Sequence, residues 1–404
     1  MNILFLTIGR MQNIMTKSIY TDLLRRFKNE GHNVYAVAPV ERREGYKTEL
    51  RKEFGINVLR IRTGNLTKTN VIEKGISTLL LEKQFLAAIK KYYRNVKFDL
   101  ILYSTPPITF ANVIRYVKRR DNAKTYLLLK DIFPQNAVDL EMFSSKSIIY
   151  KYFRNKEKQL YKISDHIGCM SQANVDYILN NNPEISKSKV HVNPNSIEVV
   201  EYEHTVEERE SIRNKYGLPM DKKIFVYGGN LGKPQGIDFL IECIKSQKDN
   251  KDIFFLVVGS GTEYYKLKKY YDTEKQADFK LLNSLPKDEY DSMIRSCDVG
   301  MIFLDKRFTI PNFPSRLLSY MQAKLPVLAV TDVNTDIGKV IVDGQFGCWC
   351  EAGKIDSFKE TLYNMTHSDM YNMGDNAYKY LLSHYTVKNT YEIIMERLNE
   401  NSCK

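Results

Sequence analysis

The sequence is poor in the features that mark disulfide-rich, metal-binding or membrane-spanning proteins. It has six cysteines in 404 residues, and only Cys348 and Cys350 lie close together, as CWC. One such pair lacks the second pair that a closed zinc site needs, and strand residues two apart face the same side, so we expect a core pair. So few cysteines suggest a reducing compartment. No run of about 18 apolar residues is present, so no transmembrane helix is expected.

The start of the chain also lacks an export signal. MNILFLTIGR has no basic leader, and its apolar run is too short for a signal peptide. We therefore expect a cytoplasmic protein, in which any membrane contact is peripheral and made at the inner face of the cell membrane. No low-complexity tract is present, and 43% of the residues are hydrophobic, so disorder is not indicated.

The charge balance is basic, with a formal net charge of +12. Nucleic acid, an anionic membrane surface and phosphorylated substrates all suit such a balance. The basic residues are dispersed over predicted helices, as at 25–26, 90–91, 118–120 and 268–269. This pattern fits solvated helix faces as well as a peripheral attraction to anionic lipid, and composition leaves both interpretations open.

Strand and helix signals alternate along the chain, which is long enough for two or three domains. Apolar runs predict strands in the first half at 3–8, 33–39, 57–62, 99–104, 124–131 and 166–171. After a linker signal near 194–206, the pattern restarts with strands at 223–228, 253–259, 279–284, 299–304 and 326–331. Helical stretches separate the strands, which favours parallel sheets covered by helices on both faces.

The predicted fold class is therefore α/β, with two doubly wound, Rossmann-like domains. We expect the first domain at 1–197 and the second at 205–384, and a last helix at 385–404 that packs back on the first domain. Ligands of such sheets bind at the carboxyl ends of the strands. We expect both sheets to present those ends to a common cleft, which would suit the joining of two substrates.

A glycine-rich turn follows the first strand of the second half, in YGGNLGKPQG at 227–236. Glycines let backbone N–H groups approach an anion, so the turn predicts a phosphate site. It is not a Walker loop, because Lys233 precedes Pro234, and Asn230 breaks the dinucleotide fingerprint. A tight turn without a ligand is the alternative. A second glycine turn, with Gly259 and Gly261, follows the next strand.

A third segment, IPNFPSRLLSYMQAKLPVLAV at 310–330, places Pro314 in a first helical turn and Arg316 near the helix start. A guanidinium there can fork onto a phosphate, and Ser319 one turn later can bond a sugar hydroxyl. The alternative is a solvated arginine and a serine that bonds its own helix.

In this order, the three segments resemble the nucleotide-binding domain of retaining GT-B glycosyltransferases of the family-4 type. Together with LPKDEYDSMIRSCDVGMIFL and HVNPNSIE, the resemblance covers most of 190–385. It is weaker over 1–190, where EGHNVYAVAP and KDIFPQNAVDL are similar to the family's first domain. The forms PSRLLSY and GNLGKPQG resemble a sub-branch that builds bacterial surface polysaccharides such as capsule and O-antigen, often from amino-sugar donors.

The sequence departs from that family at charged positions. The family's two acidic residues correspond to Pro311 and Ser319, and its first-loop arginine and lysine to Asn230 and Gln235. Arg316 and Lys233 would therefore have to neutralise the pyrophosphate of a nucleotide sugar, which the resemblance suggests is a UDP-sugar. The predicted donor-binding residues are Gly9, Arg10, Gly229, Asn230, Gly232, Lys233, Gly261, Arg316, Leu318 and Ser319.

In the first domain, KDIFPQNAVDL follows a buried strand and places Asp131 at its carboxyl end. A carboxylate there can orient or deprotonate an acceptor hydroxyl, so we predict a catalytic role. The alternative is a helix N-cap. Ser104, Thr105 and Lys130 are predicted to line the acceptor site, whereas His166 is expected to be structural.

The predicted function is glycosyl transfer, with retention, from a UDP-sugar to a lipid-linked glycan in capsule, O-antigen or exopolysaccharide synthesis. Front-face attack by the acceptor would need no protein nucleophile, only positioning and charge stabilisation. No cofactor is expected, and the resemblance implies a metal-free cationic clamp. A GT-B sugar-nucleotide epimerase, a degenerate transferase and a basic nucleic-acid-binding protein are the alternatives, although no recognition helix or RNP-type aromatic pattern supports the last.

Overall fold

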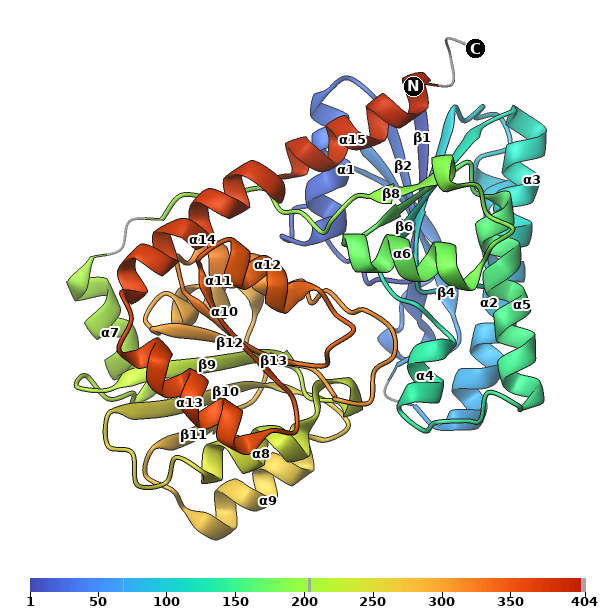
Figure 1. Cartoon of the computed structure of the whole chain (residues 1–404). Coiled ribbons are helices and arrows are strands. Elements are labelled where there is room, and N and C mark those ends of the chain that lie inside the picture. The colour runs from blue at the N-terminus through green and yellow to red at the C-terminus, as the bar shows by residue number, and fades with distance from the viewer. Residues whose placement is uncertain (68, 203–204, 401–404) are drawn as a thin grey trace. The chain divides into compact units, whose positions relative to one another are not determined.

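The structure is a computed structural model that describes residues 1–67, 69–202 and 205–400, without the side chains of 71, 72 and 74. It divides into two compact units. The first comprises Met1–Glu198 and the chain from Val387 onward, and the second comprises Val199–Thr386 (Figure 1).

An eight-stranded sheet forms the centre of the first unit, in the order β3-β4-β2-β1-β5-β6-β7-β8. All neighbours pair in parallel except β3 and β4. The strands are β1 (Asn2–Leu6), β2 (Asn33–Glu41), β3 (Glu49–Glu53), β4 (Ile56–Thr63), β5 (Leu100–Ser104), β6 (Lys124–Leu129), β7 (His166–Cys169) and β8 (Val190–Val192). The sequence pattern missed β3, because ELRKE is charged and its pairing depends on the tight turn at Phe54 and Gly55, both with positive φ.

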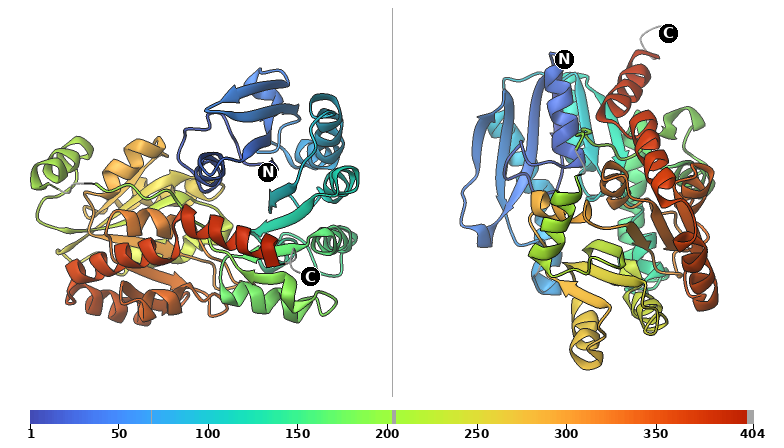
Figure 2. Two further views of the ribbon diagram at one scale, coloured as in Figure 1. Left: turned by 90° about the horizontal axis from the view of Figure 1, so that it is seen from above. Right: turned by 90° about the vertical axis from the view of Figure 1, so that its left-hand side faces the viewer.

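Helices cover both faces of this sheet (Figure 2). They are α1 (Ile19–Asn29), α2 (Val71–Tyr92), α3 (Ala111–Asp121), α4 (Gln135–Asp139), α5 (Ile148–Ile163), α6 (Gln172–Asn181) and α15 (Val387–Glu400), with 3₁₀ turns η1 (Arg42–Glu44) and η2 (Lys187–Lys189). The Ser18 side chain caps α1 by accepting a hydrogen bond from the Thr21 N–H. The last helix, α15, packs on α1, where Tyr391 contacts the Phe27 ring at 5.1 Å between ring centroids.

The second unit has a six-stranded, all-parallel sheet in the order β11-β10-β9-β12-β13-β14. Its strands are β9 (Lys223–Asn230), β10 (Ile253–Ser260), β11 (Phe279–Leu282), β12 (Val299–Phe303), β13 (Val327–Thr331) and β14 (Gly347–Glu351). The helices are α7 (Val206–Tyr216), α8 (Ile237–Lys245), α9 (Tyr264–Glu274), α10 (Lys287–Ile294), α11 (Arg316–Gln322), α12 (Ile337–Asp343), α13 (Ile355–Thr366) and α14 (Met370–His384), with the 3₁₀ turn η3 (Lys233–Gln235).

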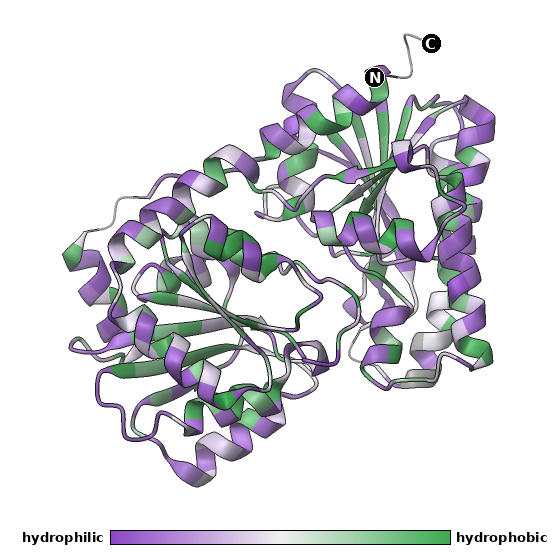
Figure 3. Ribbon diagram, in the orientation of Figure 1, coloured by the Kyte–Doolittle hydropathy of each residue, from purple (hydrophilic) through white to green (hydrophobic). Residues whose placement is uncertain are grey.

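Both sheets have apolar strands that are buried on both faces, which explains their nearly continuous hydrophobic runs (Figure 3). The predicted fold class, two doubly wound parallel-sheet domains, is confirmed. Cys348 and Cys350 lie in β14, and in the described residues no group of histidine, cysteine or acidic side chains is arranged to hold a metal ion. Within the same described ranges, each helix is too short or too polar to traverse a bilayer.

Candidate active site

The glycine-rich turn of the second unit lies at the carboxyl end of β9, where the backbone of Gly229 lies close to the Arg316 guanidinium. Gly229 has a φ of +116°, which side chains rarely adopt, and it is exposed. A Cβ built on it would lie 3.7 Å from the guanidinium carbon of Arg316. At Gly228, a Cβ would lie only 1.8 Å from the Tyr290 hydroxyl. The two glycines therefore let the strand end approach a tyrosine on one side and an arginine on the other.

Arg316 is the first residue of α11, and its guanidinium lies over the ring of Tyr227, 4.3 Å from the centroid. Its Nη1 atom is buried and has no hydrogen-bond partner among the described residues. Burial opposes its charge, but the neighbouring Tyr227 and Tyr320 raise the pKa of Arg316, so the group stays cationic. A solvated arginine, the alternative drawn from the sequence, does not describe this side chain. The side chain as a whole is half-buried, and a partly desolvated cation with no anion beside it is suited to bind an anionic ligand.

Tyr227 and Tyr320 were missed as site residues by the sequence analysis. Tyr320 accepts a hydrogen bond from the Gly228 N–H at 3.2 Å, and its ring fills the space in which Gly300 lacks a side chain. The hydroxyl of Tyr227 donates to the Asn230 carbonyl at 2.9 Å. The only sequence signal was tyrosine within otherwise apolar elements, where a buried hydroxyl needs a partner.

Other polar groups of the turn are bonded to one another. The side-chain oxygen of Gln235 accepts from Asn230 Nδ2 at 2.9 Å and from the Gly232 N–H at 3.1 Å. Gln235 therefore closes the loop. Lys233, at the start of η3, is exposed.

The second glycine turn packs directly on the first. A Cβ on Gly261 would lie 2.3 Å from the carbonyl oxygen of Leu231, and one on Gly259 would lie 2.0 Å from the Gly229 carbonyl oxygen. The Glu263 N–H also donates to the Leu231 carbonyl at 2.8 Å. The close approach of the two turns accounts for both glycines, whether or not a ligand contacts Gly261.

The remaining predicted residues of this unit lie on α11. Leu318 is 2% exposed, and its N–H donates to the Ser315 carbonyl at 3.1 Å, so neither its side chain nor its N–H is available to a ligand. Ser319 lies almost one turn after Arg316 and is half-buried. The structure therefore brings Gly229, Arg316 and Ser319 to one region of the unit.

In the first unit, the ends of the neighbouring strands β5 and β6 are tied together by Thr105. Its hydroxyl accepts from the N–H groups of Lys130 at 2.9 Å and Asp131 at 3.1 Å, and donates to the Asp131 carbonyl at 3.1 Å. Ser104 donates to the Thr7 hydroxyl at 3.5 Å. Ser104 and Thr105 are each 1% exposed, so their hydroxyls position neighbouring groups of the protein.

Asp131 is half-buried, and Asn136 donates to its Oδ1 at 2.8 Å. Burial raises the pKa of Asp131 to about 6, although hydrogen bonds from the Ile132 backbone and from Asn136 oppose the shift. The capping alternative is not seen, because α4 begins at Gln135 with Pro134 as its N-cap residue. A carboxyl group that titrates near neutral pH is suited to accept a proton from an acceptor hydroxyl.

Lys130 lies beside Asp131, and its Nζ donates to the Asn193 carbonyl at 3.4 Å. Burial lowers the pKa of Lys130 to about 7. In the segment that follows β1, the neighbour of β5, the Gly9 N–H donates to the Thr7 hydroxyl at 2.9 Å. Arg10 is exposed and lies 3.7 Å from Glu44 in η1. In the first unit, Gly9, Ser104, Thr105, Lys130 and Asp131 thus lie at the carboxyl ends of the neighbouring strands β1, β5 and β6. Arg10 is directed toward Glu44.

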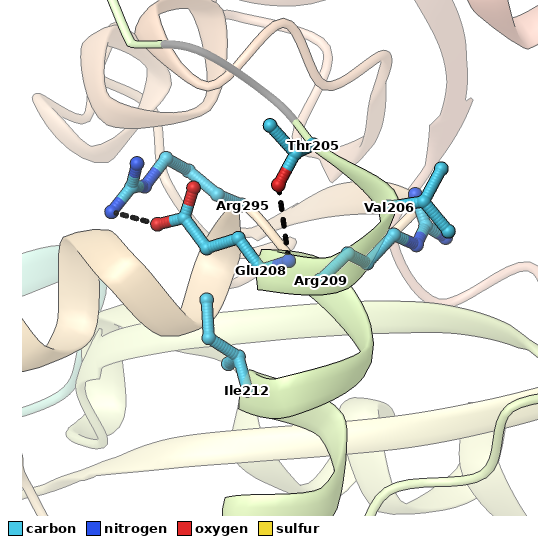
Figure 4. A pocket seen from close by; sticks show the side chains of 6 residues that line it. All are labelled: Thr205, Val206, Glu208, Arg209, Ile212 and Arg295. Atoms are coloured by element: carbon cyan, nitrogen blue, oxygen red, sulfur yellow. Dashed lines mark hydrogen bonds and ion pairs between the residues drawn. The ribbon is translucent and has the colours of Figure 1, made fainter.

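A separate hollow of about 180 Å³ lies at the start of α7 (Figure 4). Glu208 and Arg295 form an ion pair at 3.0 Å in its wall, and Thr205 accepts a hydrogen bond from the Glu208 N–H at 3.1 Å. It contains none of the predicted site residues.

Comparison with known families gives a match over residues 208–380, to the model of the glycosyl transferases group 1 family. The chain is 22% identical over 321 residues to the probable glycosyltransferase WbjE of Pseudomonas aeruginosa, covering 79% of this chain and 78% of WbjE. It is 23% identical over 257 residues to the putative colanic acid biosynthesis glycosyl transferase WcaI of Escherichia coli, covering 61% of each chain.

Solved structures show the same fold. The sucrose-phosphate synthase of Thermosynechococcus elongatus has a TM-score of 0.75 at 13% identity, with 100% of both chains covered. Anabaena HepE, solved in complex with UDP, has a TM-score of 0.69 at 14% identity, with 99% of this chain and 100% of HepE covered. The predicted enzyme class, a glycosyltransferase, is confirmed: residues 208–380, most of the second unit, match the model of the glycosyl transferases group 1 family, and the fold of the chain is the GT-B fold of these solved structures.

Proposed function

We propose that this enzyme transfers a sugar from a UDP-sugar to a lipid-linked glycan during synthesis of a bacterial surface polysaccharide, with retention of anomeric configuration. The observation that carries the proposal is the buried Nη1 of Arg316, which has no hydrogen-bond partner in the part of the chain that the structure describes, beside the exposed backbone of Gly229. The names of related proteins support the pathway: WcaI is assigned to colanic acid synthesis and Bacillus subtilis TuaC to teichuronic acid synthesis. The product we propose is capsule, O-antigen or exopolysaccharide, and an N-acetylated amino sugar is the proposed donor sugar.

The donor diphosphate is proposed to bind Arg316. A guanidinium forms paired hydrogen bonds with phosphate oxygens, and Nη1 has a donor to spare. The exposed Lys233 adds positive charge from the 3₁₀ turn that follows β9. UDP as the nucleotide is supported by HepE, solved with UDP and with UDP-glucose, and by an E. coli trehalose-6-phosphate enzyme solved with UDP-2-fluoroglucose. We expect these cationic side chains to balance the charge of the leaving diphosphate, with no cofactor required.

The acceptor is proposed to bind the first unit near Asp131 and Lys130. With a pKa of about 6, Asp131 is mostly ionised at neutral pH and can accept the proton of the attacking hydroxyl. Arg316 would hold the leaving diphosphate while the acceptor attacks from the same face, which preserves the anomeric configuration. Because the proposed acceptor is lipid-linked, we propose a cytoplasmic enzyme that works peripherally at the inner membrane face.

Calorimetric titration of UDP into the full chain tests the donor site. We expect Arg316→Gln to weaken UDP binding by roughly tenfold to a hundredfold, the usual range for a charged hydrogen bond. Arg295→Gln is the matched control, because Arg295 belongs to the same unit and pairs with Glu208 in the separate hollow. Equal UDP affinity in wild type and Arg316→Gln would contradict the proposal.

The reaction itself is tested by screening UDP-, GDP- and dTDP-sugars for transfer into a membrane extract. We expect transfer from a UDP-sugar only, with Asp131→Asn reducing the rate. Conversion of the donor to an epimer without acceptor would indicate an epimerase, and preference for a GDP- or dTDP-sugar would refute the UDP assignment.

A further inference from the structure

Tyr20 is a polar side chain of the first unit that the sequence analysis did not single out. It lies in the first turn of α1, which Ser18 caps. Because α1 follows β1, the start of the helix lies toward the carboxyl end of that strand. The neighbouring strand β5 pairs with β1 in parallel and ends at Ser104. Tyr20 therefore lies near the strand ends that carry the predicted acceptor site.

Packing holds the ring of Tyr20 in place. Its centroid lies 5.4 Å from that of Phe5 in β1. A Cβ built on Gly9 would lie 3.6 Å from two ring carbons of Tyr20 and 3.2 Å from the Thr7 hydroxyl oxygen. The ring thus lies between the sheet and the segment that follows β1, next to a glycine that was predicted to bind the donor.

The hydroxyl of Tyr20 has polar neighbours at the ends of β5 and β6. Burial raises the pKa of Tyr20, a hydrogen bond with the Ser104 side chain opposes this shift, and the Asp131 charge adds to it. Tyr20 therefore stays protonated at a pH at which Asp131, with a pKa of about 6, is ionised. The phenol can donate a hydrogen bond where the neighbouring carboxylate can accept one.

Lys130 belongs to the same group of side chains. Tyr20 and Lys130 line one cavity of about 10 Å³, which has room for at most one water molecule. Tyr20, Lys130 and Asp131 are all half-buried, whereas Ser104 is 1% exposed. A ligand at these strand ends can therefore touch the three half-buried side chains, and Ser104 acts through its hydrogen bond with Tyr20.

We propose that Tyr20 is a further residue of the acceptor site, where its hydroxyl donates a hydrogen bond to an oxygen of the acceptor sugar beside Asp131. Ser104 is then a positioning residue, because it orients the Tyr20 hydroxyl without contact to the acceptor. The inference rests on the proposed function, which places a sugar acceptor at Asp131. Each sugar hydroxyl both donates and accepts hydrogen bonds, so a carboxylate and a phenol side by side match two such groups and fix the orientation of the sugar.

Tyr20→Phe tests the hydroxyl and keeps the ring. Transfer is measured from the nucleotide sugar that the donor screen selects into increasing amounts of membrane extract. We expect Tyr20→Phe to lower the rate at limiting extract about three- to tenfold, the contribution of one neutral hydrogen bond. Its thermal midpoint should stay close to that of the wild type, because Phe5 and Gly9 contact only the ring.

Tyr35→Phe is the matched control. Tyr35 lies in β2 of the same unit, and its ring packs edge-on against Tyr93 at 5.4 Å and Phe98 at 5.3 Å between centroids. Because none of these neighbours belongs to the predicted site, Tyr35→Phe should transfer at the wild-type rate.

Ser104→Ala tests the positioning role. Because Ser104 is proposed to act through Tyr20, Ser104→Ala should lower the rate by a similar factor, and its addition to Tyr20→Phe should lower the rate no further. A purely structural role of Ser104 would instead multiply the two losses. Multiplied losses, or a wild-type rate in Tyr20→Phe, would overturn the inference.

UDP calorimetry separates this inference from the proposed function. Tyr20→Phe should bind UDP with wild-type affinity, because the donor diphosphate is proposed to bind Arg316 in the second unit. Weaker UDP binding would place Tyr20 against the donor and overturn its acceptor role. A wild type that transfers no sugar in the screen would overturn the proposed function and the inference together, whereas equal transfer by the wild type and Tyr20→Phe would overturn the inference alone.

Discussion

Replacing Arg316 with methionine should weaken donor binding without lowering the free energy of unfolding of the unliganded protein. Methionine keeps an unbranched, flexible side chain over Tyr227 but removes a half-buried charge whose Nη1 has no hydrogen-bond partner among the described residues. Relief of desolvation is worth a few kcal/mol, and loss of the contact with the Tyr227 ring costs about 2 kcal/mol. We expect the unliganded protein to change its free energy of unfolding by roughly 0 to +2 kcal/mol.

Arg213 provides the matched control, because it is a buried arginine of the same unit in which all three guanidinium nitrogens donate hydrogen bonds. Its Nε donates to the Ser296 carbonyl at 2.9 Å, its Nη1 to the Pro219 carbonyl at 2.9 Å, and its Nη2 to Asp298 at 2.8 Å. Arg213→Met leaves these acceptors without their donor, which costs about 3–5 kcal/mol. The two substitutions are chemically identical, so the difference reports both the hydrogen-bond partners of the guanidinium and its burial, since Arg213 is 3% exposed and Arg316 is half-buried.

Thermal unfolding with and without UDP is the assay. For a domain of this size, 1 kcal/mol corresponds to roughly 2–4 °C in Tm. Saturating UDP, at about 100 times Kd, should stabilise the wild type by about 2.7 kcal/mol and Arg316→Met by much less. The reasoning is refuted if Arg316→Met lowers Tm as far as Arg213→Met does, or if UDP stabilises Arg316→Met as much as the wild type.

Three further predictions concern packing, catalysis and pH. Gly261→Ala should destabilise the protein by about 2 kcal/mol in urea unfolding, because its Cβ would lie 2.3 Å from the Leu231 carbonyl oxygen, whereas Gly75→Ala, at an open position, should not. Asp131→Asn should lower kcat by about 10²–10⁴ and remove the fall in rate below pH 6, since burial raises the pKa of Asp131 to about 6; an unchanged pH profile would contradict its role as base. Burial and the Arg397 charge lower the pKa of His191 to about 4, so the unfolded chain, with a pKa near 6.5, takes up the proton first as the pH falls. Stability should therefore drop by up to about 3 kcal/mol between pH 6.5 and pH 4, and urea unfolding of His191→Phe should lack this component.

Local pattern was enough for the fold class and for the two glycine turns. Apolar runs such as those of β1, β5 and β10 identify strands that are buried on both faces, and helical spacing identifies helices such as α1. These signals are local because they come from residues a few positions apart. The strand β3 escaped them, since its charged sequence has no apolar run and its pairing with β4 depends on the tight turn at Phe54 and Gly55.

The sequence alone also determined that Arg316 and Asp131 follow strands of parallel sheets. The order of residues along the chain fixes which residue comes after which strand. Only the tertiary structure decided that Tyr227 lies beneath the guanidinium, that Leu318 is in the core, and that the pKa of Asp131 is raised by burial. The physical reason is that desolvation and unmet hydrogen bonds depend on which distant segments come together, and no local pattern records those contacts.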